Sequence, residues 1–143
     1  MASTTFTNAS DYGPDDYLTS AVNITGITVA DVTNMRFELD WNPNFSDSDD
    51  EDCGGDASSS VCVIANPDGG TFTMFAYGSK SGTIARTDTF DKTSSFPTNF
   101  NGNWTFQLTD DDAMGCNSIL ETRIIVTYST GATGSPAFLM FVD

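Results

Sequence analysis

The chain has 143 residues, a length typical of a single domain with one hydrophobic core. Twenty acidic residues oppose five basic ones, and the formal net charge of −15 excludes nucleic acids and anionic membranes as partners, because both require a basic surface. The chain contains no histidine, which excludes Ser-His-Asp triads, Cys-His pairs and histidine-ligated metals.

The remaining composition favours strands and turns. Apolar residues make up 38% of the chain and aromatic residues 12%, enough to fill the space between two packed sheets. Thr, Ser, Asn, Asp and Gly dominate the rest, whereas the straight-chain helix formers Lys, Glu and Gln are scarce. We therefore expect an all-β protein. The acidic, Thr- and Ser-rich composition also predicts an extracellular or cell-surface location and a cation as partner.

The first half of the chain contains two strand regions and a long acidic loop. Residues 1–16 are polar and rich in Thr, and we expect them to form a tail. Residues 17–29 predict two strands that break at Gly26. Between Met35 and Trp41 apolar residues alternate with charged ones, which indicates a half-buried strand. The acidic loop is expected over residues 42–60.

The second half contains a hairpin and three more strands. Residues 61–65 and 71–77 flank the turn sequence Asn66-Pro-Asp-Gly-Gly70, which predicts a β-hairpin. A strand is expected over 104–109, and a longer one from residue 119 has one face formed by Leu120, Thr122, Ile124, Val126 and Tyr128. The six apolar residues 137–142 predict a strand buried on both faces, but they are too few to insert into a membrane. Together these elements predict a β-sandwich in one domain over residues 1–143.

Two segments carry a resemblance to a known family. Residues 63–75 read Val-Ile-Ala-Asn-Pro-Asp-Gly-Gly-Thr-Phe-Thr-Met-Phe, and residues 100–110 read Phe-Asn-Gly-Asn-Trp-Thr-Phe-Gln-Leu-Thr-Asp. They resemble the "SPSGT" hairpin and the "NGTWTLTVTD" strand of the P domain (homo-B domain), which follows the catalytic unit of kexin-like and subtilisin-like proteases. The resemblance covers about residues 20–130. It implies a jelly-roll-like antiparallel β-sandwich that is non-catalytic, often binds calcium and is usually attached to a larger protein. The family has a short loop where this chain has residues 47–60.

The acidic loop is the first candidate calcium site. Its ligand candidates are Asp47, Asp49, Asp50, Glu51 and Asp52, followed by Asp56, with no base among them. Ca²⁺ takes six to eight oxygen ligands from flexible loops, so this loop offers suitable ligands in excess. The spacing is not that of an EF-hand, because Asp52 occupies the position where the sharp turn requires Gly. The alternative is a solvated acidic run without bound ions.

A second candidate site follows the strand at 104–109. Asp110, Asp111 and Asp112 are adjacent, and three carboxylates at one corner of a sheet repel each other unless a cation or backbone N–H groups lie close. Calcium is one interpretation, and a turn capped by Asp side chains is the other. Asp11, Asp15 and Asp16 form a third, weaker cluster.

Three cysteines allow one disulfide bond. Strand alternation places Cys62 on the same face as Ile64, which favours a position in the core. Cys53 and Cys116 lie in loops beside the acidic clusters, so we favour a Cys53–Cys116 disulfide. A Cys53–Cys62 bond and three free thiols are the alternatives.

The residue pattern predicts no catalysis. A glycosidase needs two carboxyl groups in contrasting environments across a sugar cleft, and nothing in the chain specifies such a pair. Trp41 and Trp104 could act as sugar platforms in a carbohydrate-binding module, but both fall on the apolar face of an alternating strand, which favours core packing. We therefore expect a calcium-binding structural module, with an accessory domain of a secreted protease and a carbohydrate-binding module as alternatives.

Self-association is the last expectation. The apolar strand predicted at 137–142 completes either its own sheet or that of a second copy. A contact between two different surfaces propagates without closing, and calcium can bridge facing carboxylates. We expect copies to associate head to tail into an extracellular filament, with calcium near the joints. The alternative is a monomer whose C-terminal strand pairs internally.

Overall fold

The computed structural model describes residues 1–44, 55–111 and 116–130. The described residues form nine strands: β1 (Ala2–Asn8), β2 (Tyr12–Asp15), β3 (Tyr17–Ile24), β4 (Val32–Asn42), β5 (Ser60–Ala65), β6 (Thr71–Phe75), β7 (Arg86–Lys92), β8 (Gly102–Asp110) and β9 (Asn117–Tyr128). Two short 3-10 turns, η1 (Val29–Asp31) and η2 (Ala57–Ser59), precede β4 and β5. No helix within these ranges is long and apolar enough to span a membrane.

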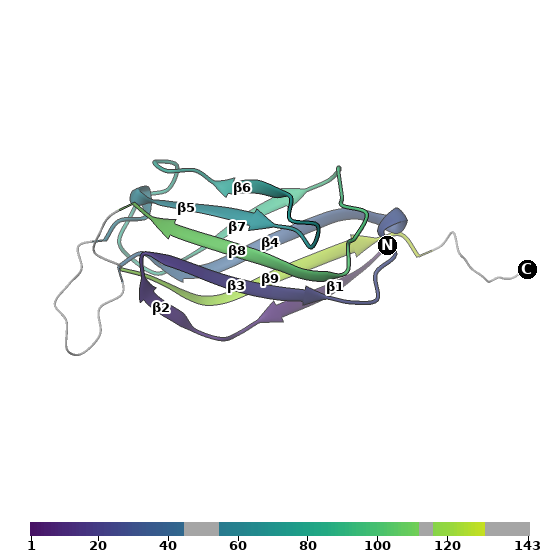
Figure 1. The fold of residues 1–143 in the computed structure, drawn as a ribbon, viewed down its shortest axis with the longest axis horizontal. Helices are drawn as coiled ribbons and strands as arrows, with labels where there is room; N and C mark the ends of the chain where they lie inside the picture. Colours follow the sequence, from purple (N-terminus) through teal and green to yellow (C-terminus); the bar gives the residue numbers. More distant parts are fainter. Residues whose placement is uncertain (45–54, 112–115, 131–143) are drawn as a thin grey trace, which may run out of the picture.

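Two antiparallel sheets pack face to face (Figure 1). Sheet A has the strand order β1-β9-β4-β7, with β2 also paired to β9, and sheet B has the order β3-β8-β5-β6. The order follows from nested pairs: β1 and β2 pair with β9, β3 with β8, β4 with β7, and β5 with β6. Nesting of this kind across two sheets is the jelly-roll topology. The predicted jelly-roll-like antiparallel β-sandwich is confirmed.

The core lies between the sheets and is rich in aromatic rings. Phe37 of β4 is fully buried, and its ring centroid lies 5.2 Å from that of Phe72, 5.8 Å from Trp104 and 6.1 Å from Phe106. Trp41 and Trp104 are both fully buried, and each indole N–H donates a 2.8 Å hydrogen bond, to Asp88 and to the Phe100 carbonyl respectively. The predicted core position of both tryptophans is therefore confirmed.

The N-terminal residues expected to form a tail are instead part of sheet A. β1 pairs with β9 over its whole length, with Phe6 opposite Ile124, and the Phe6 ring packs against the core. The Thr4 hydroxyl lies 3.0 Å from the Tyr128 hydroxyl. The expectation of a tail over 1–16 was wrong. β1 forms a strand because it pairs with β9, although its residues have too few apolar side chains to predict one.

Two further local expectations need correction. Residues 17–29 form one strand, β3, which ends at Ile24, followed by a turn at Gly26 with φ +74° and by η1. Leu120 was expected on the buried face of β9 but is 38% exposed. The pairing between β4 and β9 shifts register beside it, so that Trp41 faces Ile119, and Ile119 takes the buried place.

Replacing Phe37 by Ala tests the aromatic core. Because this ring contacts both sheets, we expect the free energy of unfolding to fall by about 3–5 kcal/mol. Urea unfolding followed by tryptophan fluorescence measures the change. Thr89→Ala, at an exposed position of β7, is the matched control and should change stability by less than about 0.5 kcal/mol. A loss below about 1 kcal/mol for Phe37→Ala would show that the core is not packed around this ring.

Candidate functional site

One end of the sandwich gathers acidic residues from three separate chain segments. They are Asp15 and Asp16 at the turn between β2 and β3, Asp56 immediately before η2, and Asp110 and Asp111 at the end of β8. The turn, η2 and the end of β8 meet at the left of Figure 1. We call these five residues the acidic end.

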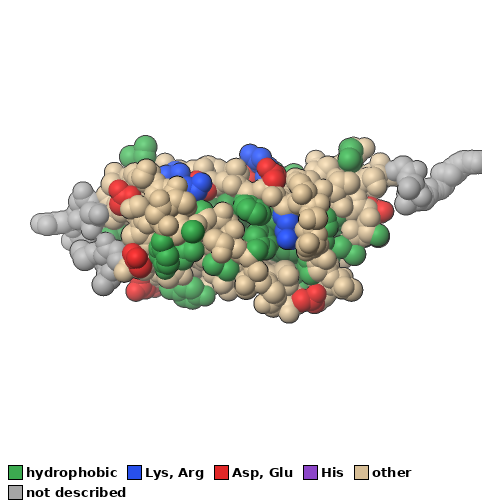
Figure 2. Space-filling view, turned by 90° about the horizontal axis from the view of Figure 1, so that it is seen from above, with side chains coloured by type: hydrophobic (Ala, Val, Ile, Leu, Met, Phe, Trp, Pro, Cys, Tyr) green, Lys and Arg blue, Asp and Glu red, His purple; other side chains and the backbone are tan. Residues whose placement is uncertain are grey.

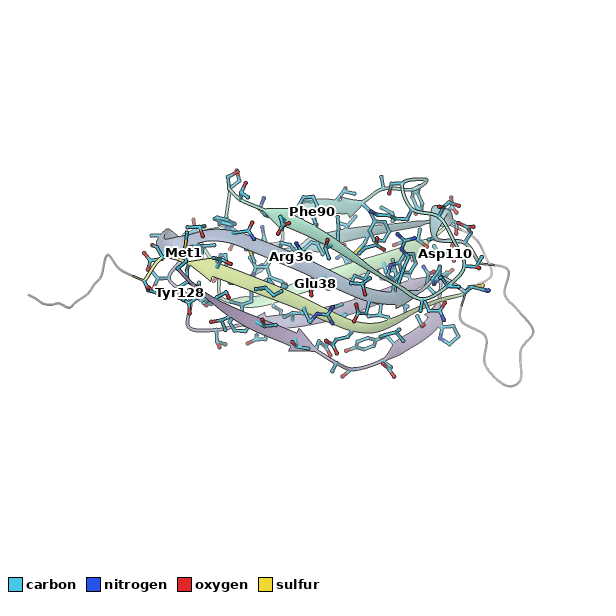
Figure 3. All side chains as sticks on the ribbon, turned by 180° about the vertical axis from the view of Figure 1, so that it is seen from behind. Met1, Arg36, Glu38, Phe90, Asp110 and Tyr128 are labelled. Atoms are coloured by element: carbon cyan, nitrogen blue, oxygen red, sulfur yellow. The ribbon has the colours of Figure 1, made fainter. Side chains whose placement is uncertain are left out.

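Hydrogen bonds hold the three segments together. The Asp110 amide donates to the Asp16 carbonyl at 2.8 Å, and the Asp111 amide donates to the Ser59 carbonyl at 2.9 Å. The Ser59 hydroxyl donates to Asp110 Oδ1 at 2.7 Å, and it also lies 2.9 Å from the Asp56 carbonyl. Asp110 is only 6% exposed and is labelled in Figure 3. The positions of these carboxyl groups are therefore determined by the fold.

The pKa values of Asp15 and Asp16 are shifted because their carboxyl groups lie close together, whereas hydrogen bonds from Ser58 and Gly82 and the charge of Arg86 lower the pKa of Asp56. A side-chain hydrogen bond with Asp15 raises the pKa of Asp16 above its ordinary value, and desolvation and the charges of Asp15 and Asp110 raise it further. The same hydrogen bond lowers the pKa of Asp15. A proton shared between neighbouring carboxyl groups is the usual response to like charges held close together, and a bound cation relieves the same repulsion.

The structure brings together only some of the ligand candidates named from the sequence. Asp110 lies beside Asp16, which the sequence placed with Asp15 in a separate and weaker cluster, and Asp111 bonds to Ser59 at the same end. The other candidates lie outside the described residues: Asp47, Asp49, Asp50, Glu51, Asp52 and Asp112. Within the described ranges, no three Cys, Asp or Glu side chains are grouped closely enough to hold a metal ion by themselves.

The ends of the acidic segment 45–54 are anchored beside the acidic end. The Gly55 amide donates to the Asn44 side chain at 3.2 Å, so the residues before and after the segment lie next to each other. Gly55 also packs against Cys116: a β-carbon placed on Gly55 would lie 2.8 Å from that of Cys116. The chain therefore enters and leaves the acidic segment at the end of the sandwich that already carries the other aspartates.

All five basic residues make ion pairs or ring contacts with residues outside the acidic end, although the charge of Arg86 also acts on Asp56. Arg36 and Arg123 lie on the outer face of sheet A, where they bind the carboxylates of Glu38, Asp40, Asp91 and Glu121 (Figure 3). Arg86 and Lys80 lie 2.8 Å and 3.6 Å from the buried carboxylate of Asp88. Lys92 lies over the Phe72 ring. Figure 2 shows basic side chains among apolar ones on the side where β6 and β7 run next to each other.

No family model matches the chain, and no match is found among curated proteins.

Replacing Arg123 by Gln tests the ion pairs of sheet A. Hydrogen bonds from Arg123 lower the pKa of Glu38 and of Asp40 below their ordinary values of 4.5 and 3.8. The stability that this pairing adds is therefore fully present at a pH above the ordinary pKa values, and it is lost as the pH falls through the lowered pKa values of Glu38 and Asp40. We expect a loss of about 1–2 kcal/mol at pH 7 that shrinks in acid, measured by urea unfolding at several pH values.

Arg36→Gln is the control for this experiment, because the Arg36 side chain is 42% exposed and its pairs are screened by solvent. Its effect should stay below about 1 kcal/mol. A pH-independent effect of Arg123→Gln would contradict the electrostatic explanation.

Thiol alkylation tests the cysteine assignments. Cys62 is fully buried and carries a free thiol, whose pKa is raised by burial, so iodoacetamide should not modify it in the folded protein. Cys53 lies outside the described residues, and the Cys53–Cys116 disulfide stays a prediction supported by the Gly55–Cys116 contact. After unfolding without reductant, mass spectrometry should find one modified cysteine, Cys62. Modification of Cys53 and Cys116 under these conditions would contradict the disulfide.

Proposed function

We propose that the chain is a non-catalytic, calcium-binding structural module that works outside the cell and associates with further copies of itself. The observation that carries the calcium proposal is the acidic end, where hydrogen bonds place aspartates of three separate segments at the same end of the sandwich. The chain also enters and leaves the acidic segment 45–54 at this end.

Calcium fits this end better than other cations. Ca²⁺ is a hard ion that binds carboxylate and carbonyl oxygens from loops in variable geometry. Asp15, Asp16 and Asp111 lie at exposed turns, where ligands can adjust, whereas Asp110 is nearly buried and held by Ser59. A hydrogen bond with Asp15, desolvation and the charges of Asp15 and Asp110 raise the pKa of Asp16, which supports a cation at this end. The bound ion would draw its remaining ligands from the acidic residues named from the sequence.

A structural role fits the remaining surface better than sugar binding does. A carbohydrate-binding module uses exposed aromatic rings as platforms, and both tryptophans of the chain are fully buried. Two exposed tyrosines, Tyr17 and Tyr77, lie on different segments and are 53% and 47% exposed. The burial of both tryptophans supports the structural module over the carbohydrate-binding alternative.

One observation favours a second candidate, an accessory P-type domain of a secreted subtilisin-like protease. The two segments that resemble the P domain correspond to the β5–β6 hairpin and to β8 with its preceding turn. β8 pairs directly with β5, with Ile64 opposite Phe106. The two segments that carry the resemblance therefore lie next to each other in sheet B. Calcium binding is common to both candidates.

Thermal unfolding with calcium and with chelator tests the proposal. Binding to the folded state alone at a hundred times the dissociation constant adds about 2.7 kcal/mol of stability. For a domain of this size, that raises Tm by about 5–10 °C. Calorimetric titration on the chelator-treated protein should show calcium binding directly. An identical Tm in EGTA and in millimolar calcium, together with no binding heat, would contradict the proposal.

Matched variants locate the site. Asp16→Asn combined with Asp111→Asn should reduce the calcium-dependent rise in Tm by at least about half, because two candidate ligands lose their charge. Asp31→Asn combined with Asp68→Asn is the control, since Asp31 in η1 and Asp68 in the β5–β6 turn lie at the opposite end and together remove the same two charges. An equal loss in both proteins would show that net charge, rather than the acidic end, determines the response.

A further inference from the structure

Among the residues that the structure describes, none on the outer face of sheet B is charged. Its outward positions on the four strands are Tyr17, Thr19, Ala21, Asn23, Val61, Val63, Ala65, Thr71, Thr73, Asn103, Thr105, Gln107 and Thr109. We call these residues the neutral face. It is the front of the molecule in Figure 1. In a chain with twenty acidic residues, a four-stranded face without a single acid is an unusual arrangement.

Strand alternation and register define this face. Cys62 and Ile64 of β5 are fully buried, so their neighbours Val61, Val63 and Ala65 point away from the core. Val63 pairs with Gln107 of β8 and with Thr73 of β6, and Gln107 pairs with Thr19 of β3. The face therefore has a central strip of small apolar side chains with hydroxyl and amide groups on both sides.

The outer face of sheet A is different in kind. It carries six charged side chains in one ion-pair network: Arg36, Glu38, Asp40, Asp91, Glu121 and Arg123. Figure 3 views this face and labels Arg36 and Glu38. Because both sheets belong to the same acidic chain, overall composition does not explain the difference between their faces. Protein interfaces are depleted of charged residues at their centre and polar at their rim, which matches the neutral face.

We propose that the neutral face binds the neutral face of a second copy, with the two B sheets packed face to face and antiparallel. This inference rests on the self-association in the proposed function and names the surface that carries it, but the contact is a closed two-fold one and not the head-to-tail contact expected from the sequence. A net charge of −15 opposes contact between copies through acidic surfaces, so a contact between two neutral faces, which brings no carboxylates together, is the one that a second copy can make.

The antiparallel orientation follows from the position of the charges. A two-fold axis that lies in the interface, perpendicular to the strands, places the two acidic ends at opposite ends of the dimer. Packed sheets lie about 10 Å apart, so the charged outer faces of the two A sheets are separated by about 30 Å. This is about three times the screening length of ~8–10 Å at physiological salt, so those faces barely repel.

The neutral face is large enough for a weak contact. Four strands about 4.8 Å apart, each about seven residues long at ~3.4 Å per residue, cover roughly 450 Å². Two such faces bury roughly 900–1,000 Å² in total, at the lower limit for a specific protein interface. We therefore expect a concentration-dependent dimer rather than a permanent one.

Charge insertion at Gln107 tests the interface, because this residue lies near the middle of the neutral face. Sedimentation equilibrium in calcium, over a wide range of protein concentration, should show a monomer–dimer equilibrium for the parent chain. Gln107→Glu and Gln107→Lys should each weaken association by at least about tenfold, since both create like charges across the two-fold axis. An equimolar mixture of the two variants should associate again through Glu–Lys pairs.

Thr89→Glu is the matched control, because Thr89 is an exposed outward residue of β7 in sheet A. It adds one negative charge, as Gln107→Glu does, and should leave association within about twofold of the parent. A parent that stays monomeric at the highest concentration overturns the proposal, as does a Gln107→Glu protein that dimerises like the parent. A monomeric parent that is retained on a neutral polysaccharide gel, together with a Gln107→Glu protein that is not retained, would also overturn the dimer proposal. It would show that the neutral face binds a glycan. None of these outcomes affects the calcium-dependent Tm, which reports on the acidic end separately.

Discussion

The contact between β4 and β8 through Phe37 and Trp104 joins the two sheets, and the rest of the structure depends on it. Each strand contributes alternate side chains to this layer, so burying the apolar face of one strand sends its polar residues to the surface. Phe72 and Phe106 complete the contact with Phe37 from sheet B. The dry aromatic layer leaves very few positions at which a charge can lie between the sheets.

Asp88 is the main charged residue that is buried in spite of this layer. Its carboxylate is 5% exposed, and it accepts hydrogen bonds from the Trp41 indole and from Arg86, with Lys80 nearby. Burial alone would raise the pKa of Asp88, but these partners lower it below its ordinary value. Two of the five bases therefore keep one buried acid ionised.

The distribution of the remaining charges divides the surface into regions. Arg36 and Arg123 neutralise much of the outer face of sheet A, while the acidic end collects aspartates at turns. The outer face of sheet B carries none of them. A jelly roll is compatible with many functions, so the functional arguments depend on these regions and not on the fold. An end that attracts cations and a neutral flat face are different surfaces and can act independently.

The sequence by itself determined the fold class and the strands that have a strong alternation of apolar and polar residues. The strands around Phe37 and Trp104 and the β5–β6 hairpin were all predicted, because a period of two and a Pro-Asp-Gly turn are local signals. β1 and β7 were not predicted, since each has a single large apolar residue and lies at an edge, where pairing with β9 or β4 determines the strand. Leu120 was misplaced because the register shift between β4 and β9, beside Leu120, changes the direction of its side chain.

The candidate site, too, was predicted from the sequence only in part. The sequence identified the acidic clusters one by one, because adjacent carboxylates are visible in a single segment. Only the tertiary structure decided that Asp16 and Asp110 lie together, since nested pairing brings the turn before β3 to the end of β8. The neutral face was also decided by the tertiary structure: its residues come from four strands, and none of those strands is free of charge in its neighbouring loops. Strand register, which no single segment encodes, places the uncharged positions on one surface.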